Sequence, residues 1–387
     1  MGKTIRLSLL MAGVATVAGG CGGVEAPSVP SAGEVWSSRP QALGEYWTVN
    51  ADMSNPRSLH TATLLESGLI LVAGGTMGSG VVSQSAELYD PYADVWRTTG
   101  SLNAPHQNFT AVRLGSGQVL VAGGQDGSGS PYSGAVELYD PATGTWNLTG
   151  SLVVPRAYHT ATLLESGEVL VTGGMTPSGD VSISTELYDP ATGTWSLAGS
   201  MSTTRFNHAA TRLYSGEVML TGGFPLMSDK VDVYNPDTRT WRQVQPMPVV
   251  RASHTATRLY SGNVMVVGGQ DVNNTVLSSV DVYDPFNDRW SSAPPMNRPR
   301  KGHTATLLYS GVLMVTGGTN ASGAPETSTE VYDPDYDRWF LIEDMPTPRT
   351  GHTATLLDTG EVVVAGGRNA SDNLLGSTVR FIPPPSE

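Results

Sequence analysis

Arginine and histidine recur together along the chain, and their side chains are its main candidates for binding or catalytic chemistry. Each arginine stands three residues before a histidine, and the pairs are Arg57 and His60, Arg156 and His159, Arg205 and His208, Arg251 and His254, Arg300 and His303, and Arg349 and His352. Guanidinium groups bind carboxylates and phosphates through paired hydrogen bonds, so six of them could form a site for an anionic ligand. Imidazoles could supply metal ligands or proton-transfer groups.

The arginines have a second interpretation, because an acidic residue recurs with the same period. The acids are Glu87, Glu137, Glu186, Asp232, Asp281 and Glu330. Internal ion pairs would account for both series. The last unit breaks the match, since Val379 replaces the acid while Arg349 remains, and the second unit has His106 in place of the arginine. Arg349 is therefore the candidate for an arginine without a partner.

The histidines occur once per unit, with Phe109 at the equivalent place in the second unit. This spacing puts them on separate structural units rather than in one cluster. We expect each imidazole to pack between units and to hydrogen bond to the backbone as a repeated structural group.

These residues belong to a unit that repeats seven times with a period of about 49 residues. A diglycine marks each unit, at Gly74-Gly75, Gly123-Gly124, Gly173-Gly174, Gly222-Gly223, Gly268-Gly269, Gly317-Gly318 and Gly366-Gly367. A tryptophan lies 27 positions before each diglycine, at Trp47, Trp96, Trp146, Trp195, Trp241, Trp290 and Trp339.

Each unit is predicted to form four β-strands. A Thr-rich apolar segment and a continuous apolar run flank a Ser-Gly turn such as Ser67-Gly68, which is typical of a hairpin because glycine accepts a positive φ. A third strand ends at Asp-Pro, since proline cannot donate to a strand ladder, and a fourth strand carries the tryptophan. Continuous apolar strands indicate sheets that are covered on both faces.

The composition and charge agree with a turn-rich β-protein and exclude one class of partner. The chain has 45 Gly and 26 Pro, and only 15% of its residues are charged. Its formal net charge is -13, so it lacks the basic surface that binds nucleic acid. We expect no nucleic-acid partner.

The beginning of the chain predicts export. Lys3 and Arg6 precede a weakly apolar run over residues 7–18 that is too short to span a bilayer. The segment Ala18-Gly19-Gly20-Cys21 resembles a bacterial lipobox, which implies cleavage before Cys21 and its lipidation, and Gly22 fits sorting to the outer membrane. Cys21 is the single cysteine of the chain, so no internal disulfide forms. We expect a signal peptide at 1–20 and a flexible Pro- and Ser-containing tether at 21–44, with membrane contact through the lipid alone.

The combination of Arg-x-x-His, an apolar strand ending in Gly-Gly, Tyr-Asp-Pro and a spaced Trp resembles the kelch repeat. The resemblance covers residues 45–387 and implies an all-β, seven-bladed kelch-type β-propeller with four-stranded blades. The last unit supplies three strands, whereas Trp47 has no strands before it. We therefore predict that the last blade is closed by an N-terminal strand, with residues 46–49 beside 377–382.

Two candidate sites follow from this architecture. The ring of Arg57, Arg156, Arg205, Arg251, Arg300 and Arg349 could face an anionic ligand at the mouth of the central channel. The loops between the second and third strands vary most and are displayed by a rigid scaffold, which favours them as a binding face. Their polar residues are Asp126, Asp180, Asp229, Asp271, Asn320, Glu326, Asn369 and Asp372, which do not form a dense calcium-binding string.

The sequence contains no familiar catalytic template, metal motif or cofactor fingerprint. Galactose oxidase-like copper chemistry requires a cysteine cross-linked to tyrosine, and Cys21 is assigned to the lipid anchor. We expect a non-catalytic, monomeric module in the cell envelope or outside the cell that binds a protein or glycan through the loop face, without a cofactor or metal. The alternatives are an exported sugar mutarotase-like or epimerase-like enzyme at the channel and an envelope structural protein without a ligand.

Overall fold

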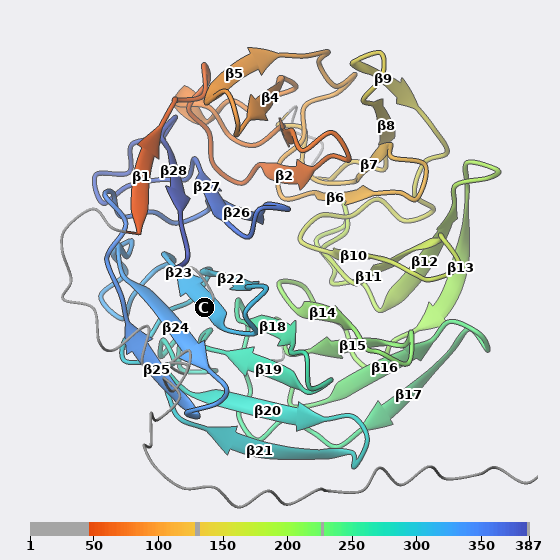
Figure 1. The fold of residues 1–387 in the computed structure, drawn as a ribbon. Coiled ribbons are helices and arrows are strands. Elements are labelled where there is room, and N and C mark those ends of the chain that lie inside the picture. The colour runs from red at the N-terminus through yellow and green to blue at the C-terminus, as the bar shows by residue number, and fades with distance from the viewer. Residues whose placement is uncertain (1–45, 128–131, 226–227, 385–387) are drawn as a thin grey trace, which may run out of the picture.

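Short strands joined by tight turns make up the chain, as its repeat predicts. The computed structural model describes residues 46–127, 132–225 and 228–384. Its 28 strands form seven antiparallel sheets of four strands, arranged as the blades of a ring (Figure 1). Many of these strands are rich in Thr and Val, whose β-branched side chains favour extended backbone. The fold is therefore an all-β, seven-bladed propeller. The predicted signal peptide, Cys21 and tether lie outside the described residues.

Each blade is listed from its innermost to its outermost strand. Blade 1 contains β2 (Thr61–Leu64), β3 (Ile70–Ala73), β4 (Ala86–Asp90) and β5 (Val95–Thr98). Blade 2 contains β6 (Thr110–Arg113), β7 (Val119–Ala122), β8 (Val136–Asp140) and β9 (Thr145–Leu148). Blade 3 contains β10 (Thr160–Leu163), β11 (Val169–Thr172), β12 (Ser184–Asp189) and β13 (Thr194–Ser200). Blade 4 contains β14 (Ala209–Arg212), β15 (Val218–Thr221), β16 (Val231–Asn235) and β17 (Thr240–Val244).

The remaining three blades follow the same order. Blade 5 contains β18 (Thr255–Arg258), β19 (Val264–Val267), β20 (Val280–Asp284) and β21 (Arg289–Ala293). Blade 6 contains β22 (Thr304–Leu307), β23 (Leu313–Thr316), β24 (Thr329–Asp333) and β25 (Arg338–Leu341). Blade 7 contains β26 (Thr353–Leu356), β27 (Val362–Ala365), β28 (Thr378–Phe381) and β1 (Trp47–Asn50).

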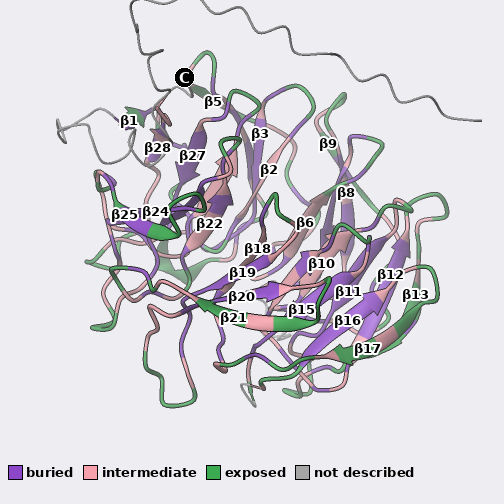
Figure 2. Ribbon diagram, turned by 60° about the horizontal axis from the view of Figure 1, so that its bottom comes forward, coloured by how far each residue is buried: buried purple, intermediate pink, exposed green. Residues whose placement is uncertain are grey.

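Burial falls from the middle of each blade toward its outer edge. The second strands, such as β3 and β11, are buried along their whole length. The outermost strands β17 and β21 are largely exposed (Figure 2). The core therefore lies between neighbouring blades, where the continuous apolar strands are covered on both sides.

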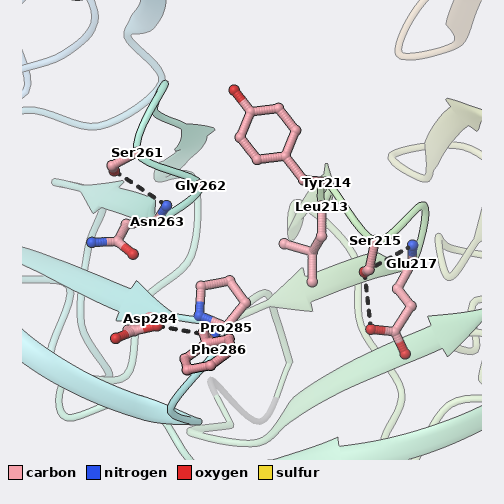
Figure 3. Close-up of a pocket in the computed structure, with 10 residues that line it drawn as sticks. All are labelled: Leu213, Tyr214, Ser215, Glu217, Ser261, Gly262, Asn263, Asp284, Pro285 and Phe286. Carbon is pink, nitrogen blue, oxygen red and sulfur yellow. Dashed lines mark hydrogen bonds between the residues drawn. The ribbon is translucent and has the colours of Figure 1, made fainter. Parts of the chain in front are cut away.

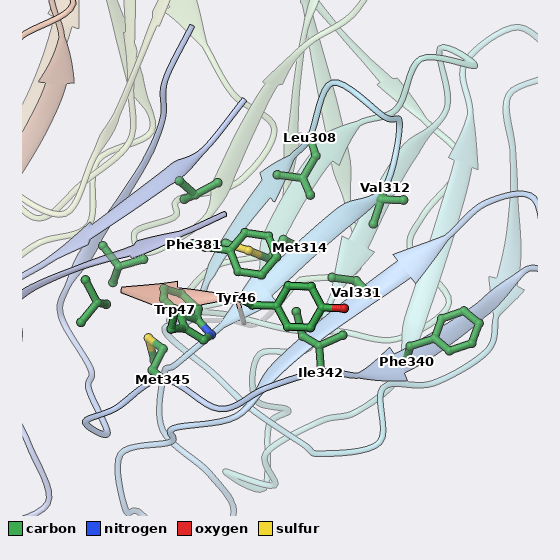
Figure 4. Close-up of a cluster of buried hydrophobic side chains, with 13 residues drawn as sticks. Tyr46, Trp47, Leu308, Val312, Met314, Val331, Phe340, Ile342, Met345 and Phe381 are labelled. Atoms are coloured by element: carbon green, nitrogen blue, oxygen red, sulfur yellow. The ribbon is translucent and has the colours of Figure 1, made fainter. Parts of the chain in front are cut away.

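The ring closes as the sequence predicts. Strand β1 pairs with β28, with Trp47 opposite Phe381 and Asn50 opposite Thr378. Figure 1 shows the beginning of the described chain beside its end in this blade. Tyr46, Trp47 and Phe381 join a buried cluster with blade 6 side chains such as Ile342 (Figure 4). The closing strand thus covers an apolar surface as well as a sheet edge.

The repeated tryptophans connect each blade to the preceding one. The indole Nε1–H of Trp146 donates a hydrogen bond of 2.8 Å to the carbonyl oxygen of Gly100, and that of Trp195 donates one of 2.8 Å to Gly150. In six blades the tryptophan contacts the repeated tyrosine, as in Tyr139 and Trp146, whose ring centroids lie 5.0 Å apart, and in blade 7 Trp47 contacts Phe381 instead, at 5.3 Å. These residues form a repeated structural element of the blade.

Alternation of strand direction gives the propeller two distinct faces. The loops between the second and third strands and the connections between blades lie on one face, which we call the 2–3 face. The turns that join the first strand to the second and the third to the fourth lie on the other, which we call the 1–2 face. In the described ranges the only helical element is the 3-10 turn η1 (Gly78–Gly80) on the 2–3 face of blade 1, and no helix there is long and apolar enough to cross a membrane.

Candidate functional site

The arginines of the predicted ligand ring lie inside the blades. At most 1% of any of them is exposed, and the set is Arg57, Arg156, Arg205, Arg251, Arg300 and Arg349. Five pair with the periodic acids of their own blades: Arg57 with Glu87 at 2.8 Å, Arg156 with Glu186 at 2.7 Å, Arg205 with Asp232 at 2.6 Å, Arg300 with Glu330 at 2.8 Å, and Arg251 with Asp281. We therefore correct the expectation of a ligand ring at the channel mouth. A buried guanidinium requires a counter-charge, and the blade supplies it.

Each arginine anchors the connection by which the chain enters its blade. Arg156 donates from Nη1 to the carbonyl oxygens of Gly173 at 2.7 Å and Ser184 at 3.0 Å. Its partner Glu186 also accepts the backbone N–H groups of Val153 and Val154, at 2.7 and 3.0 Å. The pair thus satisfies buried polar groups of the entering segment and of the third strand together.

Arg349 departs from this pattern. Its guanidinium donates to the carbonyl oxygens of Gly366 and Ser377, both at 3.1 Å, and to the hydroxyl of Ser377 at 3.2 Å. No carboxylate of the described residues lies within ion-pair distance of it, because Val379 occupies the acid position. Burial lowers the pKa of Arg349 to about 10, which the more distant charge of Asp52 only partly opposes.

The histidines connect neighbouring blades, as predicted, but through side chains. The Nε2 of His159 shares a hydrogen bond of 3.0 Å with the hydroxyl of Thr110 in blade 2, and that of His208 shares one of 3.0 Å with Thr160 in blade 3. His60 closes the ring through Thr353 at 3.1 Å. We expected backbone groups as the partners; backbone groups such as that of Ala122 do contact His159, but the bond at Nε2 is made with a threonine hydroxyl of the preceding blade.

Burial makes these imidazoles neutral. Desolvation, followed by the positive charge of the neighbouring arginine, lowers the pKa to about 3 for His60, His159, His254 and His352, and well below the usual value for His208 and His303. A neutral imidazole held in this way packs between blades and is not available to transfer protons near pH 7.

The polar residues predicted for the 2–3 loops lie on those loops, and several of them stabilise their own loop. Asp271 accepts the backbone N–H groups of Asn273 and Thr275, both at 2.8 Å. Asn320 and Asn369 accept equivalent backbone bonds in their loops. Glu326 is buried and accepts a bond of 2.8 Å from Asn320, whereas Asp372 pairs with Arg368 at 3.3 Å.

The same candidates are dispersed around the ring. They belong to blades 2 to 7, and the remaining members are Asp126, Asp180 and Asp229. Within the described ranges, no three His, Cys, Asp or Glu side chains gather closely enough to hold a metal ion. The structure does not bring the loop acids together at one point.

Seven residues with left-handed backbone conformation form a ring around the propeller axis on the 2–3 face. The residue before each histidine, or before Phe109, has a φ between 50° and 63°, and these residues are Leu59, Asn108, Tyr158, Asn207, Ser253, Gly302 and Gly351. Backbone hydrogen bonds connect neighbouring members, for example from Asn207 N–H to Tyr158 at 3.1 Å and from Gly302 N–H to Ser253 at 2.9 Å. We call this ring the annulus. Non-glycine residues adopt this conformation only where surrounding contacts determine it, so the annulus is a rigid frame.

The annulus borders a pocket on its side formed by blades 4 to 6. The pocket has a volume of about 270 Å³, and it is lined by Asn207, His208, Ser253, His254, Gly302 and His303. Its polar groups are neutral imidazoles, an amide and a hydroxyl. This arrangement can hold a small polar group of a ligand that covers the annulus.

Side chains beside the annulus differ from blade to blade. Residues directly after the arginines, or after His106 in blade 2, pair with residues directly after the diglycines. The bridges are Ser58 and Thr76, Gln107 and Gln125, Ala157 and Met175, Phe206 and Phe224, Ala252 and Gln270, Lys301 and Thr319, and Thr350 and Arg368. Blade 4 thus presents two aromatic rings, and blades 6 and 7 present cations. The backbone repeats here while the side-chain chemistry does not.

One sector of this surface combines aromatic and amide groups. The ring of Phe206 lies 5.3 Å from that of Phe224 and 6.1 Å from that of Tyr158. The side-chain amide of Asn108 donates to Gln125 at 3.0 Å, and the hydroxyl of Tyr158 donates to the same oxygen at 3.3 Å. We call Gln107, Asn108, Gln125, Tyr158, Phe206 and Phe224 the aromatic–amide patch; all six are partly exposed.

Sequence reasoning did not single out this patch. Its members stand in three columns of the repeat: the first and the second residue after the arginine position, and the residue after the diglycine. Alignment of the seven units would have shown that these columns vary beside the nearly constant arginine, histidine and diglycine columns. That contrast is the signal in the sequence that indicates the patch.

A family model described as the KLHDC2/KLHL20/DRC7 Kelch-repeats domain matches residues 108–318, more than half of the chain. The chain belongs to the kelch-repeat family. The repeat that the family model describes is the unit that forms each four-stranded blade. No curated protein sequence matches this kelch-repeat chain.

Solved structures share the propeller at low sequence identity. One is described as a novel fungal alcohol oxidase with catalytic diversity among the AA5 family, in complex with copper; it is 16% identical, with a TM-score of 0.73 over 87% of this chain and 76% of that chain. Another, described as the structure of YjhT, is 16% identical, with a TM-score of 0.59 over 76% of this chain and 99% of that chain. These similarities show the fold. Among the described residues of this kelch-repeat protein, no three His, Cys, Asp or Glu side chains lie close enough together to share a metal ion.

Proposed function

We propose that this kelch-repeat protein is an exported, lipid-anchored and non-catalytic interaction module that binds a protein or a glycan through its 2–3 face. The contrast between a repeated backbone and varied side chains at the annulus carries the proposal. A rigid frame that displays different side chains in each sector is suited to recognition of one asymmetric partner.

The aromatic–amide patch is the proposed centre of binding. Aromatic residues supply large contact areas at a low entropic cost, and amides supply hydrogen bonds in both directions. Tyr158, Phe206 and Phe224 are already packed against one another, so a partner would not have to order them. Lys301 and Arg368 lie on blades 6 and 7 of the same face and would favour a partner with acidic groups on that side.

The state of the periodic titratable groups supports a non-catalytic role. The histidines around the channel are buried and neutral, and five of the six arginines are held by carboxylates of their own blades. A general acid or base requires a pKa near the working pH and access to substrate. These groups have neither property.

Export and lipid attachment are proposed from the sequence. Lys3, Arg6 and the apolar run before Cys21 are the features that support them. Growth with a clickable fatty acid should label the wild-type protein in the membrane fraction. Cys21→Ser should be unlabelled and released from that fraction, and labelling of the variant would contradict the anchor.

Partner capture tests the binding face. The wild-type protein serves as bait for an envelope extract and, in parallel, for a glycan array, beside a Phe206→Ala/Phe224→Ala double variant. Tyr92→Ala is the matched control, because Tyr92 is 72% exposed and lies in the turn between β4 and β5 on the 1–2 face. Each bait is first compared by thermal melting.

We expect saturable binding by the wild type and the control, and at least a tenfold loss of affinity in the double variant. The 2–3 face would be contradicted as the site if every saturable ligand, protein or glycan, bound the double variant and the wild type equally. The absence of any saturable ligand would contradict the interaction role.

A further inference from the structure

Three exposed tyrosines stand in a row on the 1–2 face. Tyr214, Tyr260 and Tyr309 occupy the same turn position in blades 4, 5 and 6, between the first and second strands. Their exposed fractions are 59%, 55% and 57%. The other four blades have Glu66, Gly115, Glu165 and Asp358 at this position. We call the three residues the tyrosine arc.

The tyrosine rings are held in place by the next blade. A ring carbon of Tyr214 lies 3.2 Å from the position that a Cβ atom on Gly262 would occupy. Tyr260 and Tyr309 contact Gly311 and Gly360 in the same way, each at 3.5 Å. The guanidinium carbon of Arg258 lies 4.0 Å from the ring centroid of Tyr214. The hydroxyl of Tyr214 lies 3.5 Å from the carbonyl oxygen of Tyr260. The arc is therefore ordered before any ligand arrives, although more than half of each tyrosine is open to solvent.

A pocket of about 370 Å³ adjoins the arc at Tyr214. Figure 3 shows Leu213 and Pro285 between Tyr214 and Phe286, and all four line the pocket. Phe286 is 94% exposed, although it is a large apolar residue. The polar lining includes Ser215, Ser261 and Asn263. Apolar and aromatic side chains with a few neutral polar groups are typical of the lining of a small-molecule site.

The carboxylates of this pocket are already engaged. Glu217 pairs with Arg242 at 3.0 Å and accepts a hydrogen bond from the hydroxyl of Ser215 at 3.1 Å. Asp284 accepts the backbone N–H of Phe286 at 2.9 Å and the amide of Asn287 at 2.6 Å. The lining contains no lysine or arginine, and of its two carboxylates only Glu217 has an ion pair, with Arg242 outside the lining. Its charge fits a neutral ligand, whereas an acidic one would meet two carboxylates without a cation in the lining.

We propose that the tyrosine arc and this pocket bind a neutral oligosaccharide. Sugar rings present weakly positive C–H groups on one face, which the negative face of an aromatic ring attracts. Their hydroxyl groups match the hydroxyl and amide groups of the pocket. Three tyrosines spaced one blade apart fit a ligand with repeating units, with one end unit in the pocket. The site lies on the opposite face from the aromatic–amide patch, so it is a second site that does not depend on the proposed partner.

Calorimetric titration tests this site with soluble hexasaccharides of neutral hexoses, namely glucans, mannans and galactans, and with an acidic hexauronate as the charged counterpart. The variants are Tyr260→Ala, which removes the middle ring, and Tyr260→Phe, which keeps the ring. Tyr92→Ala is the matched control on the same face. The exposed position of Tyr260 makes each change compatible with folding.

We expect millimolar or tighter binding of at least one neutral hexasaccharide and no binding of the hexauronate. Tyr260→Ala should weaken binding at least tenfold, whereas Tyr260→Phe and Tyr92→Ala should change it less than threefold. Phe206→Ala should leave it unchanged, which separates this site from the 2–3 face. Lack of binding to all neutral hexasaccharides, a preference for the hexauronate, or unchanged affinity in Tyr260→Ala would overturn the proposal.

Discussion

The indole Nε1–H of Trp47 donates a hydrogen bond of 3.0 Å to the backbone carbonyl oxygen of Glu343, across 296 positions of sequence. This bond is the seventh copy of the contact that every other blade makes with its predecessor. It joins the first described strand to the connection that leaves blade 6. The beginning and the end of the chain thus depend on each other.

Removal of Trp47 should open the ring at blade 7. Trp47→Ala should lower the free energy of unfolding by about 3–5 kcal/mol, because a buried indole and its hydrogen bond are lost. Deletion through residue 50 should lower the melting temperature further, since β28 loses its partner strand. Thermal and urea denaturation measure both effects, with Tyr92→Ala as the exposed control. An unchanged melting temperature after the deletion would contradict closure by β1.

Arg349 should gain stability from a carboxylate at position 379. Val379→Glu restores the residue type that Glu87 provides for Arg57, and it should raise the free energy of unfolding by at least about 1 kcal/mol. The reciprocal change Glu87→Val should lower it by about 3–5 kcal/mol, because Arg57 would remain buried without a counter-charge. Urea denaturation at pH 7 compares the two. If Val379→Glu destabilises the protein as much as Glu87→Val does, Arg349 does not lack a partner.

The buried histidines should make the protein sensitive to acid. An unfolded histidine has a pKa near 6.5, and burial lowers that of folded His159 to about 3. Between these values the unfolded state binds the proton, so stability is greatest above about pH 6.5 and falls as the pH falls toward 3, by about 1.4 kcal/mol per pH unit for each such histidine.

His159→Phe tests this sign, because Phe109 fills the equivalent position in blade 2. Between pH 6 and pH 4, the free energy of unfolding should fall by about 2 kcal/mol less in the variant than in the wild type. Urea denaturation at several pH values measures this difference. Stability at pH 7.5 provides the baseline for each protein. Parallel pH profiles would show that His159 titrates normally in the folded state.

The first glycine of each pair should be intolerant of a side chain. A Cβ on Gly123 would lie 2.5 Å from the carbonyl oxygen of Arg156 and 2.9 Å from Cε1 of His159, at a φ of +65°. Gly123→Ala should therefore cost about 1–3 kcal/mol through overpacking, in addition to backbone strain. Gly78→Ala is the control, since no atom lies within 4 Å of its added Cβ. Equal melting temperatures for the two variants would refute this account of the diglycine.

The blade, the number of blades and the closure of the ring could all be predicted from the sequence. Each depends on local signals that recur in register: the Ser-Gly turn, the apolar run before the diglycine, Asp-Pro and the tryptophan. Trp47 without preceding strands, and three strands after Trp339 without a fourth, predicted β1 beside β28. Such patterns are readable because strand and turn preferences act over a few residues.

The directions in which the repeated polar side chains point depend on the packing of the whole ring. From the sequence, Arg57 could face the centre of the ring or pair with Glu87, because the two residues recur with the same period under both interpretations. In the structure they form an ion pair, since burial of an unpaired charge would cost free energy. The aromatic–amide patch and the tyrosine arc gather side chains from successive blades. Residues such as Tyr214 and Tyr260 become neighbours only when the blades pack around the ring, and that packing depends on contacts between units that no single repeat contains.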